Sequence, residues 1–467
     1  MRVQEGVLVT SRRLDLLPQG APVVAMVSGG ADSVAMLRLL VAGEMGWSGP
    51  LTVLHVNHLL RAEESDGDAV SVETLCAELG VACRIERIDV AAHAAAHGLN
   101  LEDAGRRVRY RLADEALDAA CAAAGVAPSR GRIAVAHTRD DRVETFLMRA
   151  ITGAGATGLA SIPYSRGRIA RPLLDCDRED LRAYLDDLGQ TWREDASNTD
   201  TTRLRALIRH EIVPVAEQVN PAFRETIARS LDLLAADDAL LSRMASDFAR
   251  DFAEVAPGEL VEFDREWMRT LERTMARRVV RSTVLSAFPE ASRIDSAHIE
   301  ALVDGLKDDD FARDLPDGLR AWTEYDRLVV SQAAATQPTV VALSLLPLPG
   351  IADLGRAGRI TAEEVDPEDH SGTPDSVVID AGDLTQLAVG APHEGDRMRT
   401  LGMDGTSKLS DLLIDAKVAR RLRPATPVVR DGGSIVWLAG VRMSDEYRVG
   451  PESVRAIRLT WERPEGR

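Results

Sequence analysis

Between residues 21 and 150 the sequence alternates short apolar runs with longer segments of helical periodicity, and this alternation limits the folds available to the chain. The predicted strands are 22–27, 51–57, 83–90 and 132–136, and the predicted helices are 32–41, 66–79 and 101–124. Strands that alternate with helices form a parallel sheet covered on both faces, so we expect a doubly wound α/β domain. Its ligands should bind beyond the carboxyl ends of the strands.

The rest of the chain divides by composition. Pro214 and Pro221 mark the exit from the first domain, and the following region is rich in Ala, Leu, Arg and acids, which predicts a small helical domain. The last ninety or so residues mix strand-like stretches with one basic helix at 409–418, which predicts an α+β C-terminal domain. The expected domains are 1–214, 215–335 and 336–467.

Charge and cysteine content limit the function classes. The formal net charge is −18, which argues against a nucleic-acid partner unless the basic residues are concentrated locally. Residues 397–430 carry eight basic against three acidic groups, although such a cluster can also be an ordinary solvated face. The four cysteines form no CxxC pair, so we expect free thiols rather than a zinc site or disulfides. No signal peptide or membrane span is predicted, and we expect a cytoplasmic protein.

The strongest local signal lies at 23–37, where an apolar strand runs into the turn SGGADS and then a helix. Glycines allow the backbone to approach phosphate oxygens, and the amides at a helix start attract anions. A tight turn with Asp32 or Ser33 as a helix cap would explain the same pattern. SGGADS resembles the SGGxDS loop of the ATP-pyrophosphatase (PP-loop) family. The resemblance implies that Asp32 lies near Mg²⁺ and that ATP is bound by Ser28, Gly29, Gly30, Ala31, Asp32, Ser33, His55 and Asn57.

Further motifs resemble the tRNA(Ile)-lysidine synthetase family within that class. They are HVNHLLR (55–61), AGRRVRY (104–110), AHTRDDRVET (136–145), DASN (195–198), RLRALIR (203–209), GDRMR (395–399) and KLSDLLIDAKVARR (408–421). Leu59, Thr138 and Ala206 stand where the family has glycine, histidine and asparagine. Asp140 and Glu144 share a helix face, where paired carboxylates could hold a metal or take a proton, or could simply be helix-start acids.

The resemblance implies an ATP-dependent ligase that joins L-lysine to C2 of the wobble cytidine of a CAU-anticodon isoleucine tRNA, through an adenylated tRNA. AMP and pyrophosphate are released, and codon reading changes from AUG to AUA. The lysine amine, with a reference pKa of about 10.4, must lose a proton before it attacks. The implied catalytic residues are Asp32, His137, Asp140 and Asp141, and the implied tRNA-binding residues are Arg106, Arg205, Arg209, Lys408, Lys417, Arg420 and Arg421.

Two other functions fit parts of the sequence. A tRNA thiolase of the same fold would use the same loop, but Cys76, Cys83, Cys121 and Cys176 lie outside the catalytic motifs. A nucleotide-sensing RNA-binding protein would not need the carboxylates at Asp32, Asp140 and Asp141. The lysine pocket and the oligomeric state stay open, and a homodimer is compatible with the sequence.

Overall fold

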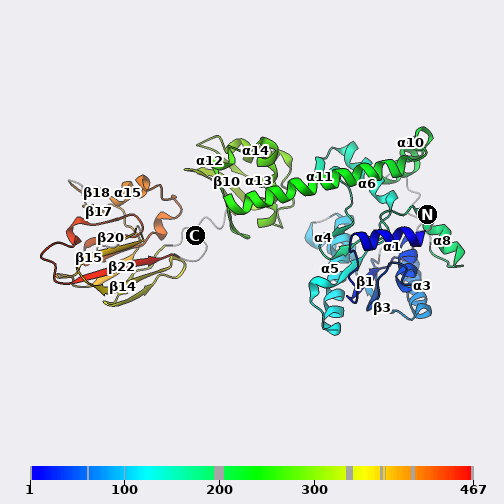
Figure 1. The fold of residues 1–467 in the computed structure, drawn as a ribbon, viewed down its shortest axis with the longest axis horizontal. Coiled ribbons are helices and arrows are strands. Elements are labelled where there is room, and N and C mark those ends of the chain that lie inside the picture. The colour runs from blue at the N-terminus through cyan, green and yellow to red at the C-terminus, as the bar shows by residue number, and fades with distance from the viewer. Residues whose placement is uncertain are drawn as a thin grey trace. The chain divides into compact units, whose positions relative to one another are not determined.

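The computed structural model describes residues 3–59, 63–98, 100–193, 204–332, 340–368, 372–373, 375–400 and 405–463. The chain forms two compact units, Met1–Leu240 and Leu241–Arg467 (Figure 1). None of the described helices is both long enough and apolar enough to cross a membrane.

The first unit is built on a six-stranded sheet with the order β3-β2-β1-β4-β6-β5, in which β5 alone is antiparallel to its neighbour. Its strands are β1 (Val23–Met26), β2 (Leu51–Asn57), β3 (Ala82–Arg87), β4 (Arg132–Ala134), β5 (Ser165–Arg166) and β6 (Ile169–Ala170). β1 lies in the middle of the sheet, with β2 and β3 on one side and β4 and β6 on the other. The chain therefore changes direction across the sheet after β3, as in a doubly wound fold. The predicted fold class is therefore confirmed.

Helices cover both faces of this sheet, as Figure 1 shows for α3 and α5. The helices of the unit are α1 (Val3–Arg13), α2 (Ala31–Val41), α3 (Glu63–Leu79), α4 (Val90–His97), α5 (Leu101–Ala124), α6 (Arg139–Thr152), α7 (Ala156–Leu159), α8 (Arg178–Asp187), α9 (Leu204–Leu207), the π-helix Ile208–Ile212 and α10 (Val213–Val219). One core joins α1, α2, α3 and α8 to the sheet, and a second joins α5 to the opposite face. The strands are accordingly apolar on both sides.

One predicted strand was too long. The strand expected over 83–90 ends at Arg87, and Val90 begins α4. Asp89 explains the change, because its side chain accepts a hydrogen bond from the Ala92 amide and caps the new helix. The alanine-rich sequence that follows favours a helix once it has been started.

The region expected to be helical contains a sheet as well. Its helices are α11 (Phe223–Phe252), which continues from the first unit into the second, α12 (Arg265–Met268), α13 (Arg273–Ala287) and α14 (Ser296–Gly305). Its antiparallel strands, in spatial order, are β7 (Ala253–Ala256), β8 (Leu260–Asp264), β11 (Arg327–Gln332), β10 (Leu319–Glu324) and β9 (Ala312–Asp314). The strands share one core with α13 and α14. Composition alone missed them because each strand is only three to six residues long and lies in an Ala-, Leu- and Arg-rich region, and because the two hairpins β7–β8 and β10–β11 are joined only by the long-range β8–β11 pairing.

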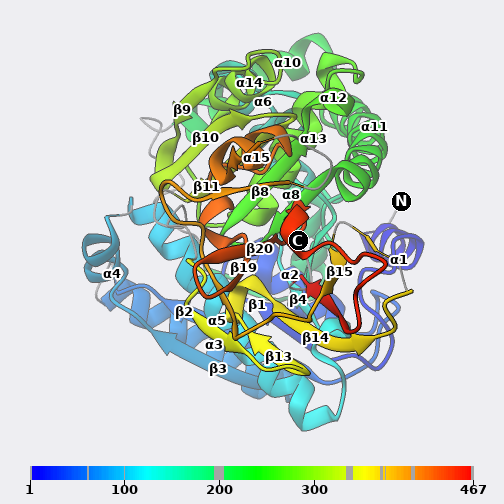
Figure 2. The same cartoon turned by 90° about the vertical axis from the view of Figure 1, so that its left-hand side faces the viewer.

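The remaining residues form two antiparallel sheets and a hairpin. The strands are β12 (Ser344–Leu346), β13 (Gly350–Asp353), β14 (Arg359–Val365), β15 (Ser376–Asp380), β16 (Leu387–Gly390), β17 (Arg397–Met398), β18 (Ser407–Lys408), β19 (Val428–Asp431), β20 (Ser434–Leu438), β21 (Arg442–Met443) and β22 (Ala456–Glu462). One sheet has the order β12-β16-β19-β20-β21 and the other β13-β14-β22-β15, and Figure 2 shows the neighbours β19 and β20. The predicted basic helix is α15 (Leu409–Asp415), so the α+β character expected here is confirmed.

Candidate active site

The SGGADS turn connects the carboxyl end of β1 to α2 and folds around the hydroxyl of Ser33. The Ser33 Oγ accepts hydrogen bonds from the amides of Ser28 and Gly29, each at 3.2 Å, and donates to the Gly30 carbonyl at 2.9 Å. Gly29 has a φ of +96°, and a side chain there would be strained. The second serine and the first glycine of the motif are thus required by the shape of the turn itself.

The amino end of α2 is left without a side-chain cap. The N-cap residue is Gly30, which has no side chain that could bond the first amides, and neither Asp32 nor Ser33 takes that place. Amides that are uncapped at a helix start carry partial positive charge and suit phosphate oxygens. The geometry therefore favours an anion site over a simple capped turn.

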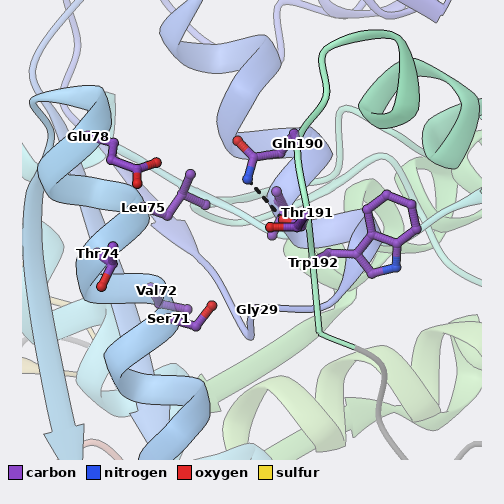
Figure 3. Close-up of a pocket in the computed structure, with 10 residues that line it drawn as sticks. Gly29, Ser71, Val72, Thr74, Leu75, Glu78, Gln190, Thr191 and Trp192 are labelled. Carbon is purple, nitrogen blue, oxygen red and sulfur yellow. Dashed lines mark hydrogen bonds between the residues drawn. The ribbon is translucent and has the colours of Figure 1, made fainter.

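The chain returns to this loop after α8. The Arg193 amide donates a hydrogen bond to the Gly29 carbonyl at 3.0 Å, and residues 190–192 run beside α3. Between them lies a pocket of about 180 Å³ with apolar and polar walls (Figure 3). It is lined by Gly29, Val34, Ser71, Val72, Thr74, Leu75, Glu78, Gln190, Thr191 and Trp192. The hydrogen bond from the Arg193 amide thus holds the glycine turn from the side of this returning segment.

A cluster of carboxylates and guanidinium groups lies at the same edge of the sheet. Arg178, the first residue of α8, donates from Nε to Asp32 at 3.3 Å, from Nη2 to Asp141 at 2.5 Å and from Nη1 to Glu144 at 2.7 Å. One arginine therefore joins the phosphate loop to the acidic helix α6. Sequence reasoning missed Arg178, although an arginine in the first turn of a helix opposes the helix dipole and signals a partner elsewhere.

The predicted tRNA-binding residues Arg205 and Arg209 also lie in this cluster. Arg205 donates to Asp141 at 2.7 Å and to Glu144 at 2.8 Å, and Arg209 donates to Glu144 at 2.7 Å. Glu144 thus accepts hydrogen bonds from three arginines while it is only 2% exposed. In this structure the arginine pair neutralises the acidic helix.

The surroundings shift the pKa values of two carboxyls in opposite directions. Burial, partly offset by Arg178 and reinforced by the charge of Asp141, raises the pKa of Asp32 to about 6. Burial also acts on Glu144, but the hydrogen bond from Arg209 and the charges of Arg178 and Arg205 outweigh it and lower its pKa to about 2. Asp32 is therefore the carboxyl of the two that titrates near neutral pH.

Thr138 explains one departure from the family pattern. Its side chain caps α6 together with Asp141: the Thr138 amide donates to Asp141 Oδ2 at 2.8 Å, and the Asp141 amide donates to Thr138 Oγ1 at 3.4 Å. Such a reciprocal pair satisfies two amides at the helix start. The threonine therefore holds the Asp141 carboxylate at the start of α6.

His137 is held by an arginine that sequence reasoning also missed. Arg171 donates from Nε to His137 Nδ1 at 3.2 Å, so Nδ1 acts as acceptor and the imidazole proton lies on Nε2. Burial, with the charges of Arg171, Arg205 and Arg106, lowers the pKa of His137 to about 4 despite the nearby Asp141. His137 is therefore neutral at pH 7 and offers a donor at Nε2. A lone arginine inside the apolar run ARPLL (170–174) is the sequence signal for Arg171.

His55 and Asn57, the other predicted ATP-binding residues, are buried at the end of β2. His55 Nδ1 lies 2.9 Å from the Val27 carbonyl, and Asn57 accepts from the Leu59 amide at 2.9 Å and donates to Asp66 at 3.0 Å. Leu59 has a φ of +54°, which explains why the family has glycine there. Both residues support the backbone at the mouth of the site.

Asp32 is the residue that fits a magnesium ion. Among the described residues no group of three or more His, Cys, Asp and Glu side chains is placed to hold a metal, so no all-protein cage exists there. Magnesium is commonly held by one or two carboxylates together with substrate phosphates. Asp32 stands in the first turn of α2 beside the uncapped amides, where a carboxylate and phosphate oxygens would meet.

The predicted tRNA-binding residues of the C-terminal region fall into two groups. Lys417 lies 2.9 Å from Asp326, and Arg421 pairs with Glu262. Lys408 and Arg420 are exposed, and neither side chain forms an ion pair with a described residue. The motif residues Leu60 and Arg61, the segment 195–198 and Arg203 lie outside the described residues.

Fold and site together define an ATP-binding enzyme of the PP-loop class, and a PP-loop domain model matches residues 10–216. A model of the TilS substrate C-terminal domain matches residues 387–461. The tRNA(Ile)-lysidine synthase of Geobacter sulfurreducens is 35% identical, over 94% of this chain and 93% of the relative. That of Symbiobacterium thermophilum is 33% identical, over 100% and 98%. A crystal structure of a TilS C-terminal domain is 30% identical over 26% of this chain and 96% of that one, with a TM-score of 0.24. The chain belongs to the tRNA(Ile)-lysidine synthase family.

Proposed function

We propose that this protein ligates L-lysine to C2 of the wobble cytidine in a CAU-anticodon isoleucine tRNA, at the expense of ATP. The observation that carries the proposal is the position of the uncapped SGGADS loop beside the acidic helix α6, in a chain that resembles lysidine synthases over almost its whole length. The loop that would bind pyrophosphate and the α6 residues that would transfer protons then lie together beyond the carboxyl ends of the parallel strands. The thiolase alternative is not favoured by the relatives, which are lysidine synthases.

The loop residues act on the nucleotide. The amides of the first turn of α2 would bind the phosphates that leave as pyrophosphate, and Asp32 would be the carboxylate that holds Mg²⁺. Magnesium, when bound, offsets the negative charge on the departing pyrophosphate. Arg178 fixes the Asp32 carboxylate through its 3.3 Å contact. Adenylation of the C2 oxygen makes a poor leaving group into a good one.

The residues around α6 act on the second step. The amine nitrogen of lysine forms a bond to C2, the bond from C2 to oxygen breaks, and its electron pair leaves with AMP. His137 donates from Nε2 to the departing oxygen, since its Nδ1 is occupied by Arg171. Asp140 accepts the proton from the amine, because its partners are the Arg178 amide at 2.9 Å and Arg224 at 3.5 Å, whereas Asp141 is engaged by two arginines and the Thr138 cap.

The test is mass analysis of a CAU-anticodon tRNA after incubation with the protein, ATP, magnesium and lysine. Lysidine formation adds one lysine residue to the tRNA, and AMP and pyrophosphate appear in equal amounts. Transfer of sulfur, or the absence of any tRNA product while ATP binds, would instead support the thiolase or the nucleotide-sensing function.

A further inference from the structure

Arg171 differs from the other deeply buried arginines of the described chain because it lacks an acidic partner. The four arginines classed as buried are Arg142, Arg171, Arg265 and Arg430. Arg142 pairs with Asp232 at 2.8 Å, Arg265 with Asp309 at 2.8 Å and Arg430 with Asp396 at 2.5 Å. Arg171 is 3% exposed, and no described carboxylate lies within ion-pair distance of it.

Neutral groups surround the Arg171 guanidinium instead. It donates to His137 Nδ1 at 3.2 Å and to the Pro163 carbonyl at 2.8 Å, and the Tyr110 hydroxyl lies nearby. These bonds occupy two of the five N–H donors of the guanidinium and supply no negative charge. Burying a charge without a counter-ion is costly. The desolvation of the Arg171 guanidinium is therefore not offset by a carboxylate, as it is for the other three buried arginines. A ligand anion would remove that cost.

Three further arginines lie in the same part of the unit: Arg149 and Arg171 donate to the carbonyls of Ser161 and Pro163, two residues apart, and the β5–β6 hairpin brings Arg166 close to Arg171. Arg106 lies on α5 with its guanidinium 5.3 Å from the centre of the Tyr110 ring, Arg149 lies on α6, and Arg166 ends β5. None of the three forms an ion pair with a described acidic side chain. Burial, with further lowering by the charges of Arg106 and Arg166 despite the Tyr110 hydroxyl, lowers the pKa of Arg171, and burial with Arg106 lowers that of Arg149. Like charges therefore act on Arg171 and Arg149, and no described carboxylate forms an ion pair with any of the four arginines.

The four arginines differ in burial, so that two lie beneath the surface and two lie at it. Arg171 is buried and Arg149 half-buried, with its Nη1 donating to the carbonyls of Gly158 and Ser161, whereas Arg106 and Arg166 are exposed. His137 adjoins this set through Arg171, and it also lies within the influence of Asp141 and Arg205, which belong to the cluster in which Arg178, Arg205 and Arg209 are matched by Asp141, Glu144 and Asp32. The catalytic histidine thus lies where a charge-balanced cluster meets an unbalanced basic one.

We propose that Arg106, Arg149, Arg166 and Arg171 form a phosphodiester-binding site for the RNA strand next to the target cytidine, with Arg106 and Arg166 contacting phosphate and Arg149 and Arg171 supplying positive charge beneath. This inference rests on the proposed function. ATP also carries phosphates, but the amides of the SGGADS loop already serve them. RNA is the other polyanion of the reaction, and its affinity depends on unpaired cations. A protein of net charge −18 has particular need of such a site.

The test measures tRNA affinity at several salt concentrations for the whole protein, for Arg166→Gln and for the double variant Arg106→Gln/Arg166→Gln. Arg130→Gln is the matched control, because Arg130 is an exposed arginine that also lacks an ion pair with a described residue but precedes β4, at the opposite sheet edge. The slope of log affinity against log salt should fall by roughly 0.7 to 0.9 for each phosphate that a variant no longer neutralises. The KM for ATP should stay at the wild-type value.

Two results would overturn the inference. If Arg166→Gln and the double variant bind tRNA with the same slope as Arg130→Gln, the site does not contact RNA phosphate. If the KM for ATP rises while the tRNA slope is unchanged, the anion belongs to the nucleotide. Lysidine formation by the wild-type protein is read separately by mass, so failure of the proposed function is recognised independently of the binding slopes.

Discussion

Replacing Glu144 with glutamine should destabilise the first unit by about 3 kcal/mol at pH 7. The side chain is 2% exposed and accepts hydrogen bonds from Arg178, Arg205 and Arg209. The pKa of Glu144 falls from 4.5 to about 2 on folding, and at about 1.36 kcal/mol per pH unit this difference corresponds to roughly 3 kcal/mol. Removing one member of a buried ion pair costs a similar amount, about 3 to 5 kcal/mol.

The pH dependence gives a second test of the same reasoning. Because the folded pKa is lowered, the contribution of Glu144 is complete above pH 4.5 and disappears as the pH falls toward 2. At pH 3.5 the wild-type protein should have lost about 1.4 kcal/mol of this contribution. Glu144→Gln has none to lose, so the stability difference between the two proteins should shrink on acidification.

The measurement is hydrogen exchange of α6 peptides in a urea series at pH 7 and in acid. Glu300→Gln is the control, because Glu300 also binds two arginines, Arg273 and Arg277, but on the surface of the second unit. Exposed pairs of this kind contribute less than about 1 kcal/mol. A loss below about 1 kcal/mol for Glu144→Gln at pH 7, or a difference that does not shrink in acid, would refute the reasoning.

Three further variants test the site and the C-terminal region. Asp32→Ala should abolish AMP formation while tRNA affinity stays near wild type, because a metal-positioning carboxylate acts on chemistry; parallel loss of affinity and pyrophosphate release would contradict that role. His137→Gln should keep more lysidine synthesis than His137→Asn, since the glutamine amide can replace the Nε2 donor and the asparagine amide cannot; the reverse order in a turnover assay would exclude the donor role. Lys408→Ala/Arg420→Ala should lower the salt slope of tRNA binding by roughly 0.7 to 0.9 for each phosphate no longer neutralised. Lys417→Ala should change it less, because Lys417 is paired with Asp326, and equal slopes in a titration would count against this distinction.

The loop and the sheet could be predicted because local sequence determines them. An apolar strand, two adjacent glycines and a helix specify the 23–37 segment without reference to distant residues. The sheet follows from repeated strand and helix alternation. Asp89 shows the limit of this reasoning, since one capping side chain turned the end of a predicted strand into the start of α4.

The partners of the arginines could not be predicted, because they are set by tertiary contacts. Arg178 contacts Asp32, which is 146 positions away in the sequence, and Arg205 contacts Asp141 from 64 positions away. Sequence spacing placed Arg205 on a helix face suited to RNA, but it could not show that an acidic face of α6 lies opposite. A basic residue in the sequence becomes a cation available to RNA only if folding leaves it without a carboxylate.

That distinction explains how an acidic protein can bind RNA. Most arginines of the site are neutralised by α6 and by Asp32, so they contribute little to attraction at a distance. Among the described residues, a few cations have no acidic partner, such as Arg166, Lys408 and Arg420. These cations attract RNA phosphates, while the protein as a whole carries a net negative charge. Repulsion elsewhere on the surface disfavours other docking orientations, while these few contacts favour one. The affinity should accordingly show a shallow salt slope, and each unpaired arginine removed should account for a large share of it.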